Sequence, residues 1–123
     1  MYNNGFGGFV KTRRAALRLS LRHFAERAGM DPGNISRLER GRLAPPESSE
    51  VLDRIASALE LAKGSAEYEQ LSDLAAGAKG RIPQDLLSDE EVAARLPILF
   101  RTLRNKPLSG EQLERLIDSI RQA

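Results

Sequence analysis

Hydrophobic residues recur at intervals of three and four along nearly the whole chain of 123 residues, which is the period of an α-helix. No segment alternates strictly between apolar and polar residues, as a half-buried strand would. The sequence therefore predicts an all-α protein. Its length favours one domain, or one small domain with an appendage.

Start and stop signals divide the first part of the chain into short helices. Phe6 to Leu17 form the first apolar stripe. The second helix is expected to start after Ser20, whose hydroxyl suits an N-cap, and to end at Gly29, which suits a left-handed backbone. Asp31 and Pro32 are a strong start signal for a third helix, because proline is tolerated at the first helical position. This helix is expected to run to about Arg40.

Two further helices follow a proline-containing loop. One covers residues 50–61, after a cap at Ser48 or Ser49, and the other covers residues 66–78, after a cap at Ser65. Glycine and proline then indicate a linker.

Beyond the linker lie two more helical segments, each with a predicted capping box: Ser88 with Glu91, and Ser109 with Gln112. Pro97 predicts a kink or a short break in the first of them. The resulting organisation is a five-helix domain over residues 1–78, a linker over 79–87 and a C-terminal helical extension over 88–123.

Charge is unevenly distributed along the sequence. Residues 1–44 contain nine basic and three acidic residues, a net charge of +6, whereas residues 45–123 contain ten basic and fourteen acidic residues, a net charge of −4. This asymmetry indicates that the first third faces a polyanion. The alternative is that its arginines only solvate helix faces.

The segment around Gly29 has the pattern of a helix-turn-helix, in which two short helices are joined by a glycine-containing turn. Ala25 is small where the helices must approach closely, and Ile35 and Leu38 are placed to anchor the second helix to the core. The second helix of such a motif can enter the major groove of DNA.

At this point the chain resembles the Cro and phage-repressor (Xre) helix-turn-helix family. The resemblance rests on "LSLRHFAERAGMDPGNISRLERGRLAPP" followed by "LDRIASALEL", and on Ile35 to Gly41 as the "I-S-x-x-E-x-G" ending. It covers roughly residues 8–76. It implies a five-helix repressor-like DNA-binding domain that acts as a dimer on paired half-sites, so that double-stranded DNA and a second copy are the expected partners.

The resemblance also implies an ion pair between Arg14 of the first helix and Glu39 of the "E-x-G" ending. Helical periodicity independently places Glu39 near the side of Ile35 and Leu38. Because an unpaired buried charge is costly, a half-buried Glu39 requires a partner. Arg14 and Glu39 are therefore interpreted as scaffold.

The opposite face of the third helix carries the candidate DNA contacts. Arg37 has the reach and the fork geometry for a bidentate contact to a guanine edge, and Asn34 and Ser36 are its expected supports in base reading. Residues near the helix end and on the second helix are expected to bind phosphates; these are Arg22, Arg40 and Arg42.

Pro32 and Gly33 stand where the family's best-known members have polar side chains. A helix N-terminus offers free N–H groups, and glycine allows the backbone to approach a phosphate closely. We therefore expect the amides of Gly33 and Asn34 to clamp a phosphate, while Arg37 reads bases one turn later.

Other chemistries find little support. The chain has no cysteine and one histidine, His23, which excludes disulfides and thiolate or histidine-rich metal sites. The acids at residues 89–91 suit the first turn of a helix. Glycines 5, 7 and 8 follow no strand, so they do not form a phosphate-binding loop. We expect neither an enzyme nor a cofactor or metal, and no membrane segment or signal peptide, hence a cytoplasmic protein.

The C-terminal extension is amphipathic, and its apolar stripes must be buried somewhere. Three alternatives are open: folding back on the first five helices, pairing with the same elements of a second copy, or gripping a different protein, as the antitoxins of toxin–antitoxin operons do. Dimerisation is the favoured interpretation. The candidate interface residues are Leu99, Phe100, Leu103, Leu113, Leu116, Ile117 and Ile120.

Overall fold

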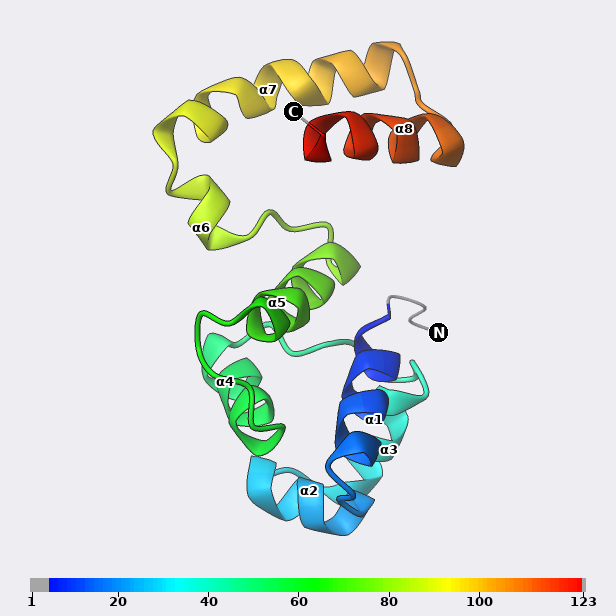
Figure 1. The fold of residues 1–123 in the computed structure, drawn as a ribbon, viewed down its shortest axis with the longest axis vertical. Helices are drawn as coiled ribbons and strands as arrows, with labels where there is room; N and C mark the ends of the chain where they lie inside the picture. Colours follow the sequence, from blue (N-terminus) through cyan, green and yellow to red (C-terminus); the bar gives the residue numbers. More distant parts are fainter. Residues whose placement is uncertain (1–4, 123) are drawn as a thin grey trace. The chain divides into compact units, whose positions relative to one another are not determined.

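The computed structural model describes residues 5–122, and the regular secondary structure within this range is entirely helical (Figure 1). This confirms the predicted all-α class. The helices are α1 (Phe6–Ala16), α2 (Leu21–Ala28), α3 (Pro32–Glu39), α4 (Ser49–Ala58), α5 (Ala66–Ala78), α6 (Gln84–Leu87), α7 (Glu90–Asn105) and α8 (Gly110–Arg121).

The chain divides into two compact units, residues 1–83 and residues 84–123. Within unit 1, α1 packs against α3 and α5, and α2 packs against α3 and α4. Every buried hydrophobic side chain of the described range belongs to this unit, from Phe6 to Ala75. From the sequence, residues 79–87 are expected to be a linker without regular structure. In the structure α6 lies within this segment, and the boundary between the two units falls between residues 83 and 84.

The N-terminal caps of unit 1 follow the sequence signals. The side chains of Ser20, Asp31, Ser48 and Ser65 each accept a hydrogen bond from the backbone N–H three residues later. Ser48, rather than Ser49, is therefore the cap of α4. Gly29 ends α2 in the left-handed region, with φ 65°, where glycine has no steric penalty. These predictions are confirmed, because a cap depends only on residues within one helical turn.

A glycine in α1 brings this helix close to the end of α3. A Cβ atom added to Gly7 would lie 2.3 Å from the carbonyl oxygen of Leu38 and 2.8 Å from that of Glu39. Only a residue without a side chain fits there. Residues 6–8 are therefore part of a packed helix, and Gly7 sets the separation of α1 and α3.

One predicted capping box is wrong and the other is confirmed. Asp89, rather than Ser88, caps α7 and accepts hydrogen bonds from the backbone N–H groups of Glu91 and Val92. The Ser88 hydroxyl, just after the end of α6, instead donates to the carbonyl oxygen of Gln84, the first residue of α6. At α8, Ser109 and Gln112 make the reciprocal bonds of a capping box.

Of the two outcomes predicted at Pro97, a kink or a short break, the break is absent, because α7 continues through this residue. Proline removes one backbone hydrogen bond. The carbonyl oxygen of Ala93, four residues earlier, loses this bond, and Ala93 is not buried, so that water can reach it. No helix between residues 5 and 122 is long and apolar enough to cross a membrane.

Candidate nucleic-acid interface

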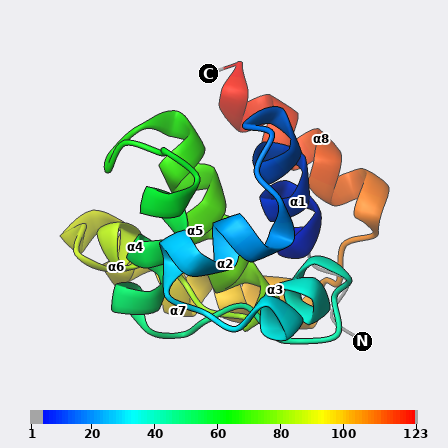
Figure 2. The ribbon, with the colours of Figure 1, turned by 90° about the horizontal axis from the view of Figure 1, so that it is seen from below.

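The turn between α2 and α3 is held by backbone hydrogen bonds. The N–H of Gly29 donates to the carbonyl oxygen of Glu26 at 3.2 Å, and the N–H of Met30 donates to that of Ala25 at 2.9 Å. Ala25 is 1% exposed, and its small side chain lets α3 approach α2. The two helices thus form the helix-turn-helix that the sequence predicts, and Figure 2 looks onto them.

Burial fixes which face of α3 points outward. Ile35 and Leu38 are 0% and 2% exposed, so this side is anchored in the core. Arg37 and Arg40 are exposed, as is Gly33, while Asn34 and Ser36 are half-buried. The face predicted to bind DNA is therefore accessible.

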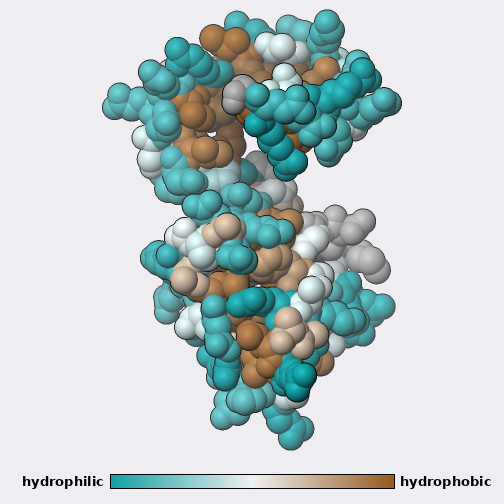
Figure 3. Space-filling view, viewed as in Figure 1, coloured by the Kyte–Doolittle hydropathy of each residue, from teal (hydrophilic) through white to brown (hydrophobic). Residues whose placement is uncertain are grey.

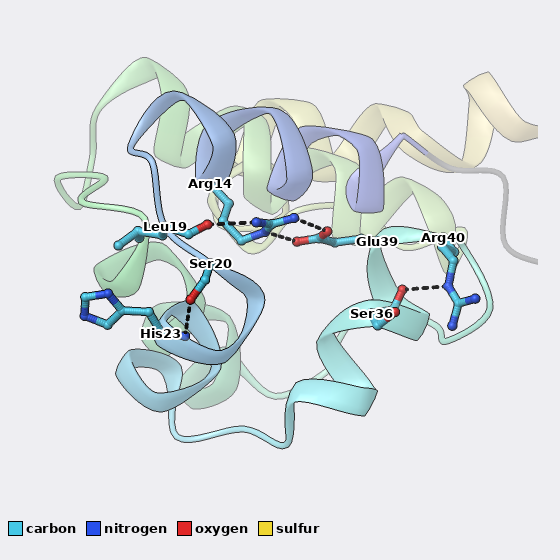
Figure 4. Close-up of polar contacts among 7 residues, drawn as sticks. All are labelled: Arg14, Leu19, Ser20, His23, Ser36, Glu39 and Arg40. Carbon is cyan, nitrogen blue, oxygen red and sulfur yellow. Dashed lines mark hydrogen bonds and ion pairs between the residues drawn. The ribbon is translucent and has the colours of Figure 1, made fainter.

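Arg14 and Glu39 form a bidentate ion pair between α1 and α3 (Figure 4). The Nε and Nη2 atoms of Arg14 donate to the two carboxylate oxygens of Glu39 at 2.7 and 2.9 Å, and Nη1 donates to the carbonyl oxygen of Leu19 at 2.8 Å. The hydrogen bond to Glu39 raises the pKa of Arg14 above its ordinary value. The negative charge of Glu39 is therefore neutralised on the inner side of α3.

The side chains of Arg37 and Asn34 are joined on the outer side of α3. Nη2 of Arg37 donates a hydrogen bond to Oδ1 of Asn34. This bond orients the guanidinium group along the exposed face. Asn34, expected to help read bases, is thus in contact with the arginine one turn away.

The N-terminus of α3 differs from the predicted phosphate clamp. The backbone N–H of Asn34 donates to Oδ2 of Asp31 at 3.2 Å, so this amide already has an anionic partner. A Cβ atom on Gly33 would lie 2.8 Å from the same Oδ2. The amide of Asn34 therefore donates to the Asp31 cap and is not free to bind a phosphate. Gly33 has no side chain that would collide with the capping carboxylate.

The other basic residues of the candidate interface lie on α2 and at the end of α3. Arg22 and Arg42 are exposed. Nε of Arg40 donates to the carbonyl oxygen of Ser36 at 3.3 Å (Figure 4), so its side chain lies back along α3. Arg27, by contrast, is engaged by Glu60 at 3.4 Å.

Packing brings a further arginine close to the turn. Nη1 of Arg54, on α4, lies 3.5 Å from the position of a Cβ on Gly29. Sequence reasoning did not single out this residue, because it follows the turn by 25 positions and lies in the acid-richer part of the chain. Only the contact between α2 and α4 places it there.

His23 is exposed on α2, and its backbone N–H donates to the Ser20 hydroxyl oxygen (Figure 4). Within the described range, no three His, Cys, Asp or Glu residues are grouped so that they could hold a metal ion.

Comparison with known protein families agrees with this geometry. The family model described as "Helix-turn-helix domain" matches residues 6–67, just over half of the chain. Among solved structures, the clp gene regulator ClgR from Corynebacterium glutamicum is similar to this chain, with 27% sequence identity, a TM-score of 0.48 and coverage of 88% of this chain and 97% of that one. No curated protein matches.

Proposed function

Because the chain belongs to the helix-turn-helix domain family, whose members bind DNA to regulate transcription, we propose that α3 reads double-stranded DNA in the major groove. Arg37 is assigned the base contact, and Asn34 supports it by orienting its guanidinium group. Ser36 is assigned a secondary contact. Arg22, Arg40, Arg42 and the backbone at Gly33 are assigned to phosphates.

The observation that carries this proposal is the charge of the outer face of α3. Arg37 and Arg40 are exposed there, whereas Glu39 is 5% exposed at its side chain and is paired with Arg14. Asp31 serves as the cap. The exposed face of α3 is thus positively charged, and the opposite face is held in the core. Both properties favour base contacts within the negatively charged DNA duplex.

We further propose that the protein is a regulator of the Cro and phage-repressor (Xre) type and that it acts as a homodimeric repressor. Two copies would place two α3 helices about one turn of DNA, ~34 Å, apart. The motif from Ile35 to Gly41 and the apolar C-terminal helices support this interpretation.

Selection of bound sequences from a random pool of double-stranded DNA tests the proposal. We expect a defined site, and we expect Arg37→Ala to weaken binding to that site by about 1–3 kcal/mol with loss of preference at one base pair. Arg37→Lys is the matched control, since it keeps the charge but loses the bidentate fork. It should retain non-specific binding and lose the same preference. Unchanged selection by both variants would refute the role of Arg37.

A second candidate function is an antitoxin-type module that neutralises a partner toxin and regulates its own operon. The exposed apolar side chains of unit 2 favour it, because they offer a surface for another protein. An unrelated chain that co-purifies stoichiometrically with the full protein, but not with a protein lacking residues 88–123, would support this candidate.

A further inference from the structure

Unit 2 has hydrophobic side chains but no core of its own. None of residues 84–122 is buried. Figure 3 shows hydrophobic side chains gathered on α7 and α8. The large side chains that remain 40–67% exposed on these two helices are Ile98, Leu99, Phe100, Leu113, Leu116, Ile117 and Ile120. A surface of this kind, on helices that bury nothing themselves, indicates an interaction site.

The apolar stripe of α7 has a spacing that suits helix–helix pairing. Val92, Leu96, Leu99 and Leu103 follow one another at intervals of four, three and four residues. At about 100° per residue they fall within about 60° of each other on the helix. This is the narrow seam of a coiled coil, and the interval pattern is the same when the helix is read in reverse.

Charge along α7 is segregated by position. Asp89, Glu90 and Glu91 lie at its start, and Arg104 and Lys106 at its end. The helix dipole favours this arrangement within one helix. Between two helices it also determines direction, because parallel copies would place like charges together, whereas antiparallel copies place each acidic end beside a basic end.

We propose that a second copy of the chain covers the stripe of Val92, Leu96, Leu99 and Leu103, with the two α7 helices paired antiparallel. Leu99 is exposed in this stripe, and the other three residues are half-buried. Val92 then lies opposite Leu103 of the second copy, and Leu96 lies opposite Leu99. The stripes of the two α8 helices, around Leu116, complete a four-helix bundle.

The composition of unit 2 matches a copy of itself better than a strongly charged partner. Residues 84–123 contain six basic and seven acidic residues. The complement to an acidic end and a basic end around an apolar centre is the same helix reversed. This inference rests on the proposed homodimer and specifies its interface.

Charge reversal at both ends of α7 in the full-length protein tests the orientation. By symmetry, Glu91→Lys places a positive charge next to the basic end of the second copy twice per dimer, and Lys106→Glu has the converse effect. We expect each single variant to raise the dimer dissociation constant about tenfold at low salt. The double variant should return to within about threefold of the original protein, because the contacts are attractive again.

Sedimentation equilibrium measures these constants, and circular dichroism checks that the variants keep their helix content. Arg101→Glu is the matched control for Lys106→Glu: it makes the same charge change about 170° from the centre of the stripe and should leave the constant unchanged. Equal constants for all the proteins would overturn the antiparallel pairing and leave the homodimer standing. An original protein that stays monomeric would overturn both, without bearing on base reading by Arg37.

Discussion

The two sides of α3 have different roles: residues on the inner side hold the helix in place, and residues on the outer side are the candidate DNA contacts. Glu39 faces inward and receives the Arg14 guanidinium group at 2.7 Å, while Arg37 faces outward and donates to Asn34. Loss of either partner of the inner pair would leave a mostly buried charge without compensation. In the outer pair Arg37 is exposed and Asn34 is half-buried, so we expect substitutions there to affect DNA recognition more than stability.

A second residue-scale feature lies between α4 and α5. The Tyr68 hydroxyl donates to Oδ1 of Asp53. This hydrogen bond, with burial and the negative charge of Asp53, raises the pKa of Tyr68 above its ordinary value of about 10. A pKa raised by folding means that the contribution to stability is present below about pH 10 and is lost as pH rises through the folded value.

We therefore predict that the pKa of Tyr68 lies above about 10 when tyrosinate absorbance is followed at alkaline pH in Tyr2→Phe, which leaves Tyr68 as the one tyrosine of the chain. Asp53→Asn should lower the pKa of Tyr68 towards about 10, because both the carboxylate acceptor and its charge are removed. Asp73→Asn, a change of an exposed acid on α5, is the control and should leave the titration as it was. A pKa of Tyr68 that is the same with and without Asp53→Asn would contradict the prediction.

At the scale of elements, the position of α3 depends on its contact with α1. Gly7 is buried against the carbonyl oxygens of Leu38 and Glu39, whereas a Cβ atom on Gly8 would meet no atom within 4 Å. Neighbouring glycines of one helix therefore have opposite requirements. The first permits close approach, and the second only weakens the helix.

Gly7→Ala should destabilise the protein by about 1–3 kcal/mol, since backbone atoms cannot yield as a flexible side chain would. Gly8→Ala is the matched substitution and should stabilise it by about 0.5–1 kcal/mol, because alanine is the better helix former. Urea denaturation followed by circular dichroism gives both values. Equal effects of the two changes would show that α1 and α3 are not in the described contact.

At the scale of the whole molecule, the two units differ in burial. Unit 1 contains a hydrophobic core, whereas none of the described residues of unit 2 is buried. The net charge of +6 lies in residues 1–44, and the rest of the chain carries −4. Binding to DNA should therefore weaken steeply as salt is raised, because each neutralised phosphate releases counterions.

Arg42→Ala should reduce the slope of log affinity against log salt by about 1 and weaken all DNA sequences about equally. The exposed position of Arg42 just after α3 is the reason for this assignment. Arg101→Ala, which removes the same charge from unit 2, should leave the slope unchanged. Fluorescence anisotropy over a series of salt concentrations measures both. A change of base preference in Arg42→Ala would contradict its assignment to a phosphate.

Features that depend on near neighbours in the chain could be predicted from the amino-acid sequence. Helical periodicity, the caps at Ser20, Asp31 and Ser65, and the inward side of Ile35 and Leu38 all follow from residues within one or two turns. The exposed face of α3 follows from the same periodicity. For this reason most of unit 1 and the accessible side of the candidate interface could be predicted.

Contacts between residues far apart in the chain could be known only from the folded structure. Gly7 fits against the end of α3, and Arg54 lies beside Gly29. Both contacts join residues at least 25 positions apart, and helical periodicity carries no information about such distances.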